Sequence, residues 1–190
     1  MNNEKITGVT TFFIDDKIDT GDILIQEKIK IDKKINAGEL HDKLKLIGAS
    51  IVEKTLKGIV ENSLQRVKQI QKKDFNTAYK FDKKNIKIDW NHNCLEIYNK
   101  IRGLSPYPGA KTSFVSKSGE TVNTIFYESE YLVEKHNHNN GTIIHEKGKI
   151  KITCKNGYLF IKNLKIEGKR RMDTESLLNG FKIEKYEMVK

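Results

Sequence analysis

Two short hydrophobic runs lie near the start of the sequence, separated by an acidic segment. The runs cover residues 8–14 and 23–26 and consist largely of Val, Ile, Thr, Phe and Leu. These residue types are enriched in β-strands, and neither run is interrupted by charged positions. The pattern therefore predicts two buried strands joined by the acidic segment 14–22.

A longer amphipathic stretch follows these strands. Apolar side chains recur at helical spacing, which predicts a helix over residues 37–61. Asn36 and Glu39 stand three residues apart at its start, in the order of a capping box. The predicted apolar face, which needs a sheet to pack on, consists of Leu40, Leu44, Ile47, Ile51, Thr55, Leu56, Ile59 and Val60.

The pattern changes beyond residue 62. Residues 62–87 are polar and rich in Lys and Gln, which predicts an extended connector between two domains. A second helix is predicted to open at residues 89–91 and to end at Gly103, because Pro106 follows shortly afterwards.

Short strands and turn signals fill the rest of the sequence. Asn156-Gly157 lies between two β-rich runs, which predicts a type I′ hairpin. Several short strands at such spacing indicate a small barrel. Asp173 is placed to cap a last short helix that ends by Gly180.

The charge of the protein is unevenly distributed. The formal net charge is +10; residues 1–75 hold 14 basic and 12 acidic residues, whereas residues 76–190 hold 21 and 13. A cationic domain attracts polyanions, which makes nucleic acid the first partner to consider and an acidic membrane surface the second. A solvated Lys-rich surface without a partner is the alternative.

The cysteines and the hydropathy of the sequence indicate the cellular compartment of the protein. Cys94 and Cys154 form no Cys-x-x-Cys pair and have no His at metal-ligand spacing, which argues against a disulfide scaffold and a zinc site. No apolar run approaches the roughly 18 residues of a membrane span, and the first five residues lead into no signal-peptide core. We expect a cytoplasmic protein without a membrane partner.

The acidic segment is the first candidate for chemistry. It holds Asp15, Asp16, Asp19 and Asp22 beside Gly21. Asp and Gly are also ordinary turn formers, so a plain turn is the simpler interpretation of this segment alone. Asp-Thr-Gly also occurs in aspartic proteases, but the sequence has one copy, and Asp22 stands where that pattern has Ser or Ala.

The histidines offer little evidence of a metal site. His136, His138 and His145 flank a polar turn without a carboxylate or Cys at matching spacing, so we expect solvated loop residues and no metal. His41 lies beside Asp42 on the predicted helix, where a surface role is expected. No dinucleotide-binding, Walker A or Gly-x-Ser-x-Gly pattern occurs.

One compact basic cluster is a candidate for phosphate binding. Lys169-Arg170-Arg171 follows Gly168 at the end of a predicted barrel strand. Arg102 and Lys111 would join the cluster if the helix end and the first barrel strand lie nearby. A solvated basic loop is the alternative.

Four stretches of the sequence, in this order, resemble methionyl-tRNA formyltransferases. They are residues 7–10 running on to 18–24, the segment Ile88-Asp89-Trp90, residues 101–110 (IRGLSPYPGA), and residues 168–172 (GKRRM) with 177–180 (LLNG). The last two are specific to this family among formyltransferases. The resemblance covers nearly the whole sequence.

The resemblance implies an α/β fold followed by a barrel. Residues 1–62 would be the C-terminal part of a Rossmann-like formyltransferase domain, residues 63–84 a linker, and residues 85–190 a small open, OB-like β-barrel that binds tRNA. A complete protein of this family would be a monomer. If the N-terminal half of the enzyme is encoded apart, it would be a further partner of this chain.

The resemblance also implies an activity and the residues that serve it. Proteins of this family transfer a formyl group from 10-formyltetrahydrofolate to the amino group of methionyl initiator tRNA, in translation initiation and without a metal. Asp19 matches the family's catalytic Asp, and Asp15, Asp16, Lys17 and Ile18 match the loop that lines the folate pocket. The expected tRNA-binding residues are Arg102, Lys111, Lys169, Arg170 and Arg171.

Two alternatives to this activity stay open. The family's catalytic Asn and His lie in an Asn-x-His-Pro-Ser loop that the 190 residues do not contain, so we expect the chain alone to be inactive. A non-catalytic tRNA-binding module is therefore the alternative from another class. A sugar or purine formyltransferase is the alternative within the fold, and segments 101–110 and 168–172 argue against it.

Overall fold

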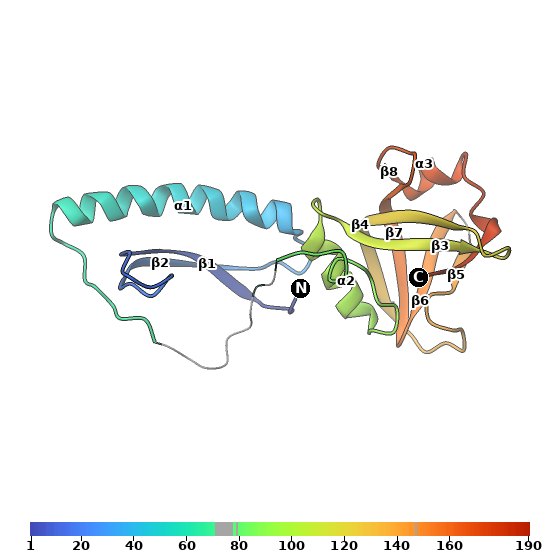
Figure 1. Ribbon diagram of the computed structural model, residues 1–190, viewed down its shortest axis with the longest axis horizontal. Coiled ribbons are helices and arrows are strands. Elements are labelled where there is room, and N and C mark those ends of the chain that lie inside the picture. The colour runs from blue at the N-terminus through green and yellow to red at the C-terminus, as the bar shows by residue number, and fades with distance from the viewer. Residues whose placement is uncertain (71–77, 79, 147) are drawn as a thin grey trace. The chain divides into compact units, whose positions relative to one another are not determined.

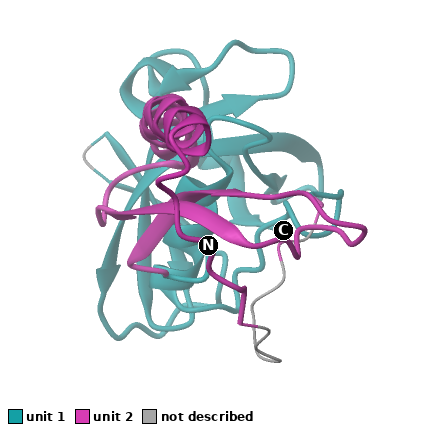
Figure 2. Ribbon diagram, turned by 90° about the vertical axis from the view of Figure 1, so that its left-hand side faces the viewer, with its two compact units in different colours: residues 1–3, 81–190 teal, residues 4–80 magenta. Residues whose placement is uncertain are grey.

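The chain forms two units, which are described separately below (Figure 1). One unit comprises residues 4–80 and the other comprises residues 1–3 and 81–190 (Figure 2). The computed structural model describes residues 1–70, 78, 80–146 and 148–190. Part of the predicted linker therefore lies outside the described residues. None of the described helices is long and apolar enough to cross a membrane.

The unit of residues 4–80 is a two-stranded antiparallel sheet with one long helix. β1 (Ile6–Phe12) pairs with β2 (Ile23–Lys30), and α1 (Ala37–Val60) packs on both strands. The Asn36 side chain accepts a hydrogen bond from the Glu39 N–H, and the Glu39 carboxylate accepts one from the Asn36 N–H, each at 3.0 Å. The predicted helix and its capping box are confirmed.

Burial in this unit is lower than the sequence pattern predicts. The residues of β1 and β2 are half-buried or exposed instead of buried, because α1 covers one face of the sheet. On α1, Ile51 is fully buried, whereas Leu56 and Val60 are 60% and 82% exposed. The predicted apolar face is therefore wrong at its C-terminal end, since a sheet of two strands is too narrow to cover all eight positions.

The other unit is a nearly closed, barrel-like sheet of seven strands. Six of them lie in the order β5-β6-β7-β4-β3-β9, and β8 pairs with β7. A bridge between Thr142 and Met188, with the Val189 N–H donating to the Gly141 carbonyl at 2.8 Å, joins the two edges. The strands are β3 (Ala110–Ser116), β4 (Thr121–Val133), β5 (Ile143–Glu146), β6 (Lys149–Cys154), β7 (Gly157–Ile166), β8 (Met172–Asp173) and β9 (Tyr186–Val189).

One helix contributes much of the barrel core. α2 (Cys94–Leu104) packs chiefly on β4, and its Ile97, Ile101 and Leu104 are buried among the apolar residues of the sheet. Two short helices follow later in the chain, α3 (Thr174–Leu178) and the 3₁₀ helix η1 (Ile183–Lys185). The predicted cap of α3 is confirmed, because the Ser176 N–H donates to the Asp173 carboxylate at 2.7 Å.

The start of α2 differs from the prediction. Trp90 lies before the helix, in the barrel core, where its indole N–H donates to the Thr112 hydroxyl at 3.1 Å and its ring meets Phe126 edge-on. The helix begins only at Cys94, after Asn93 in the capping position. The prediction of a helix opening at residues 89–91 is wrong, because burial of the large indole outweighs the local helical pattern.

The predicted β6–β7 hairpin is present, but its turn type is not the predicted one. Cys154 pairs with Gly157, so Lys155 and Asn156 form the turn, and neither has the positive φ that a type I′ turn requires. The Asn156 side chain instead accepts a hydrogen bond from the Cys94 N–H, at 2.9 Å, at the start of α2. A contact distant in sequence thus replaces the expected local geometry.

The close approach of β4 to Gly157 generates a stability prediction. A Cβ at this position would lie 2.0 Å from the Leu132 carbonyl oxygen, whereas nothing lies within 4 Å of a Cβ at Gly180. Gly157→Ala should lower the free energy of unfolding by at least about 1–3 kcal/mol, and Gly180→Ala should leave it nearly unchanged. Urea unfolding followed by the fluorescence of Trp90 would measure both; equal midpoints would contradict this account of Gly157.

Candidate functional site

Hydrogen bonds to its backbone groups hold the acidic loop between β1 and β2 in place. The Phe13 N–H donates to the Asp22 carbonyl at 3.0 Å, and Gln69 Nε2 donates to the carbonyls of Asp19 and Gly21 at 3.0 and 2.7 Å. Gly21 is required by sterics, because a Cβ there would stand 1.6 Å from the Phe13 carbonyl oxygen. The loop is therefore fixed at both ends.

Asp15 orders the loop from within. Its Oδ1 accepts hydrogen bonds from the Thr20 hydroxyl at 2.7 Å and from the Lys17 N–H at 3.0 Å. These two donors, the hydroxyl first, hold the pKa of the Asp15 carboxyl below its ordinary value, because they stabilise the ionised form. The side chain of Asp15 is thus engaged in turn formation.

Asp19 presents its carboxylate to solvent from an uncommon backbone conformation. Its φ is +55°, in the left-handed region where Asp and Asn are enriched. Asp15, Asp16, Lys17 and Ile18 precede it on the same exposed segment, so the structure brings all five predicted residues of the loop together. An exposed carboxylate can accept a proton or orient a cationic group, and acyl transfer needs further groups around it.

The histidines His41 and His136 contact groups outside the acidic loop. His41 on α1 lies 3.5 Å from the Asp42 carboxylate. His136 donates through Nε2 to the Cys154 carbonyl at 2.7 Å and packs on Tyr158, so the expectation of a solvated residue is wrong for this half-buried ring. Within the described ranges, no three His, Cys, Asp or Glu side chains gather as metal ligands.

The cluster Lys169, Arg170 and Arg171 lies in the turn between β7 and β8. Arg171 is held in place, because its Nε donates to the Asn163 side chain and its guanidinium lies 4.3 Å from the centre of the Tyr127 ring. Lys169 and Arg170 are exposed. The cluster lines a cavity of about 420 Å³ together with Met172, Asp173, Ser176, Leu177 and Gly180.

Arg102 and Lys111 do not line this cavity. Arg102 lies on α2, where its Nε donates to Asn99 Oδ1 at 2.8 Å and its guanidinium lies 5.9 Å from the centre of the Tyr98 ring. Lys111 projects from the outer face of β3 into a second cavity. The five basic residues predicted from the sequence therefore occupy more than one place on this unit.

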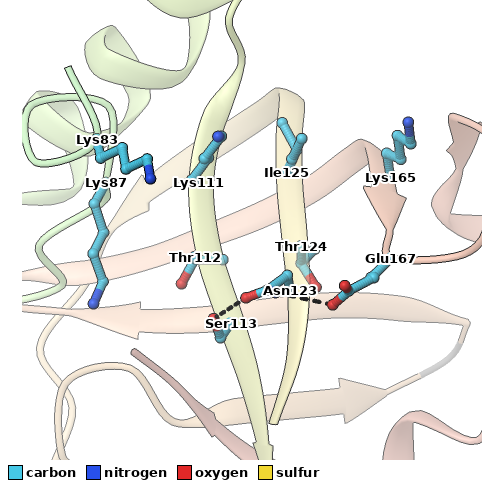
Figure 3. A pocket seen from close by; sticks show the side chains of 10 residues that line it. All are labelled: Lys83, Lys87, Lys111, Thr112, Ser113, Asn123, Thr124, Ile125, Lys165 and Glu167. Carbon is cyan, nitrogen blue, oxygen red and sulfur yellow. Dashed lines mark hydrogen bonds between the residues drawn. The ribbon is translucent and has the colours of Figure 1, made fainter. Parts of the chain in front are cut away.

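The second cavity, of about 460 Å³, lies on the outer face of β3, β4 and β7 (Figure 3). Lys111 pairs with Ile125 and Ile125 pairs with Lys165, so these three residues form one row across the strands. Lys83 and Lys87, from the segment before α2, lie beside Lys111. We call these four lysines the lysine row.

A polar row runs parallel to the lysine row, two residues further along the strands (Figure 3). Ser113 Oγ donates to Asn123 Oδ1 at 3.1 Å, and Asn123 Nδ2 donates to Glu167 Oε2 at 2.9 Å. Asn123 on β4 therefore links β3 to the residue that follows β7. The remaining lining residues of the cavity are Thr112 and Thr124.

Lys83, Lys87 and Lys165 in this cavity were missed from the sequence, although a signal exists for Lys87 and Lys165. Lys165 alternates with the buried Leu164 and Ile166, and Lys87 stands between the buried Ile86 and Ile88. A period of two places such residues on the outer face of a strand. The juxtaposition of these segments in space, however, follows from strand pairing that the sequence does not show.

The comparisons with known proteins agree with this architecture. Residues 1–56 match the family model described as formyl transferase, and residues 80–182 match the model of the formyl transferase C-terminal domain. A methionyl-tRNA formyltransferase of Flavobacterium johnsoniae is 45% identical over 180 residues, which cover 95% of this chain and 57% of the relative. The chain thus spans little more than half the length of that relative.

Solved structures show the same fold. WlaRD, described as a sugar 3N-formyl transferase, has a TM-score of 0.59 at 26% identity, over 89% of this chain and 58% of its own. A variant of HypX from Aquifex aeolicus has a TM-score of 0.65 at 16% identity, over 96% of this chain and 32% of its own. The similarity to HypX concerns the fold alone.

The chain belongs to the formyl transferase family. Within that family it is similar, over nearly its whole length, to proteins named methionyl-tRNA formyltransferase, two of which are 45% and 41% identical to it. The resemblance inferred from the four sequence stretches is confirmed.

The hydrogen bonds of Asp15 generate a pH prediction. Because the pKa of its carboxyl is lowered in the folded loop, the ordering contacts are complete above its ordinary value of 3.8 and are lost as the pH falls through the lowered pKa. The NMR shift of the Lys17 amide should therefore titrate with a midpoint below 3.8, and Asp15→Asn should abolish the transition. A wild-type midpoint at or above 3.8 would contradict the assigned contacts.

Proposed function

We propose that this chain forms the acidic-loop and tRNA-binding portions of a methionyl-tRNA formyltransferase. The complete enzyme, a cytoplasmic monomer, transfers a formyl group from 10-formyltetrahydrofolate to the amino group of methionyl initiator tRNA. The observation that carries the proposal is the 45% identity to an enzyme of that name over 95% of the chain. Residues 1–62 are then the end of the catalytic domain, residues 63–84 the linker, and residues 85–190 an OB-like barrel.

Asp19 is the residue of this chain that we assign to catalysis. In formyl transfer the amino nitrogen attacks the formyl carbon, the bond from that carbon to folate N10 breaks, the amine loses a proton, and N10 gains one. The exposed Asp19 carboxylate would orient the catalytic His and assist this proton transfer. The folate pocket would be lined by other residues of the same loop, Asp15, Asp16, Lys17 and Ile18. The reaction would need no metal.

The chain requires other groups for turnover. The resemblance assigns an Asn and a His to the site, in a loop that this sequence does not contain, and the His41 ring lies next to Asp42. We therefore expect no formyl transfer by the 190-residue chain alone. A separate polypeptide with the N-terminal half of the enzyme would supply the missing groups.

The barrel provides the contacts to tRNA in this proposal. Lys169 and Arg170 are exposed in one cavity, Lys111 lies in another, and Arg102 lies on α2. Cationic side chains of this kind neutralise backbone phosphates, so the binding should weaken steeply with salt. Arg171 contributes charge as well, although its packing on Tyr127 gives it a structural role too.

A non-catalytic tRNA-binding module is the second candidate function. It is favoured by one observation, that the barrel unit has its own buried core and bears most of the positive charge. This candidate predicts tRNA binding without transfer even when an N-terminal half is supplied. Restored transfer would exclude it.

The catalytic assignment is tested by complementation. The chain would be combined with the N-terminal part of the Flavobacterium johnsoniae relative, and formylation of methionyl-tRNA would be followed with a labelled donor. Asp19→Asn should lower the rate about 10²–10⁴-fold while tRNA affinity stays nearly constant, because the change removes charge at the reacting centre. Asp42→Asn, on the exposed side of α1, is the matched control.

Two results would overturn the proposal. If Asp19→Asn and Asp42→Asn lowered the rate equally, Asp19 would have no catalytic role. If an amino sugar were as good an acceptor as methionyl-tRNA in the complemented enzyme, the assignment of tRNA as the substrate would be wrong.

The basic cluster should control the salt dependence of tRNA binding. Lys169→Ala combined with Arg170→Ala should weaken binding and reduce the slope of log affinity against log salt by about 2, since each lost phosphate contact removes about 1. Arg171 is left intact because of its packing on Tyr127. Lys135→Ala, at an exposed position after β4, is the control, and an equal slope in both variants would count against the cluster.

A further inference from the structure

A short segment after α1, residues 63–69, runs back to the sheet and contacts the acidic loop; we call it the return segment. We infer that Gln69, at the end of the return segment, is a positioning residue that fixes the backbone of the acidic loop and thereby the carboxylate of Asp19. The inference rests on the proposed function, because it specifies what holds the residue that we assign to catalysis.

The return segment is itself anchored to the sheet. The guanidinium of Arg66 lies 4.3 Å from the centre of the Phe13 ring. Val67 forms an antiparallel bridge with Ile23 at the start of β2, and the two N–H···O=C bonds of this bridge measure 2.8 and 2.9 Å. Gln69 follows two residues after the bridge, so its side chain approaches the loop from a fixed position.

The side-chain amide of Gln69 joins two carbonyls of the loop. Its Nε2 carries two hydrogens and donates to the carbonyl oxygens of Asp19 at 3.0 Å and Gly21 at 2.7 Å. Thr20 stands between them, and its hydroxyl donates to the Asp15 carboxylate at 2.7 Å. This turn is therefore held through its backbone by Gln69 and through a side chain by Asp15.

The backbone conformation of Asp19 depends on such contacts. Its φ of +55° lies in the left-handed region, which is unfavourable for a residue with a Cβ. The direction of the Asp19 carbonyl follows from ψ of the same residue, so a donor fixed in front of that carbonyl selects one backbone conformation. An Asp side chain has a single carbon between Cα and the carboxyl group, so the carboxylate moves with the backbone.

Proton transfer is sensitive to such movement. A group that accepts a proton or orients a catalytic His must lie within about 2.6–3.2 Å of its partner. A displacement of about 1 Å can lower a rate about 100-fold. Loss of the two bonds from Gln69 should therefore lower kcat, whereas the affinity for tRNA, which the proposed function assigns to the barrel, should not change.

The test measures kcat and KM for methionyl-tRNA in the complemented enzyme. Gln69→Met keeps most of the side-chain volume and removes both donors, so it should lower kcat about 10- to 100-fold and leave KM nearly unchanged. Gln65→Met, at an exposed position of the same segment, is the matched control and should change neither. A wild-type kcat in Gln69→Met would overturn the inference.

A double variant separates positioning from a general structural effect. If Gln69 acts through Asp19, Gln69→Met should have little further effect on kcat in an enzyme that already carries Asp19→Asn, because residues that act as a unit are not additive. A loss of the same factor with and without Asp19→Asn would mean that Gln69 acts elsewhere, and the inference would be wrong.

Hydrogen exchange of the full chain provides a readout that needs no turnover. The Phe13 N–H donates to the Asp22 carbonyl where the loop meets the strands, and Gln69→Met should speed its exchange about 5- to 100-fold. The amide of Ile51, in the middle of α1, should exchange as in the wild-type chain. An unchanged rate at Phe13, or an equal acceleration at both amides, would contradict a specific hold on the loop.

The failure of this inference is distinguishable from that of the proposed function. If Asp19→Asn lowers the rate far more than Asp42→Asn but Gln69→Met leaves kcat unchanged, the positioning role is overturned and the proposed function stands. If Asp19→Asn and Asp42→Asn lower the rate equally, the catalytic assignment fails, and the role of Gln69 in catalysis fails with it.

Discussion

The antiparallel register of β3, β4 and β7 is the constraint on which the outer face of the barrel depends. Side chains alternate between the two faces of a strand, so a shift by one residue would turn Lys111 into the core and Thr112 out of it. The inward residues resist such a shift. Trp90 bonds the Thr112 hydroxyl, and Phe114 and Phe126 pack together in the same core. The position of every charged group on this face follows from that packing.

In the unit of residues 4–80, a different constraint determines the conformation of the acidic loop. Its sheet is small and only half-buried, yet its acidic loop is defined by backbone contacts that leave no room for a side chain at Gly21. Gln69 adds two hydrogen bonds from a distant part of the chain. A loop can therefore present ionised groups to solvent at a fixed position without being buried itself.

The sequence predicted those features that depend on nearby residues. The capping box at Asn36, the cap at Asp173 and the helix that follows each were found because a few consecutive side chains determine them. The errors came from distant partners: Trp90 leaves the helical pattern for the core, and Asn156 bonds α2 instead of forming the expected turn. The acidic loop and the basic cluster were found as segments, and their catalytic and tRNA-binding roles stay predictions.

The second cavity shows what the sequence could not supply. Lys165 was recognisable as an outward residue, but its place beside Lys111 depends on the pairing of both strands with β4. Pairing between distant strands is decided by the whole core, and no local pattern records it. The polar row across Asn123 is hidden for the same reason.

The hydrogen bond between Asn156 and Cys94 has a consequence for biosynthesis. The two residues are 62 positions apart, and α2 leaves the ribosome long before the hairpin that completes its first turn. Until then the Cys94 N–H is bonded to water, and the apolar side chains of the helix have no sheet to cover them. The barrel should therefore mature late and in one step, and nascent chains that stop before β7 should be substrates for chaperones and proteases.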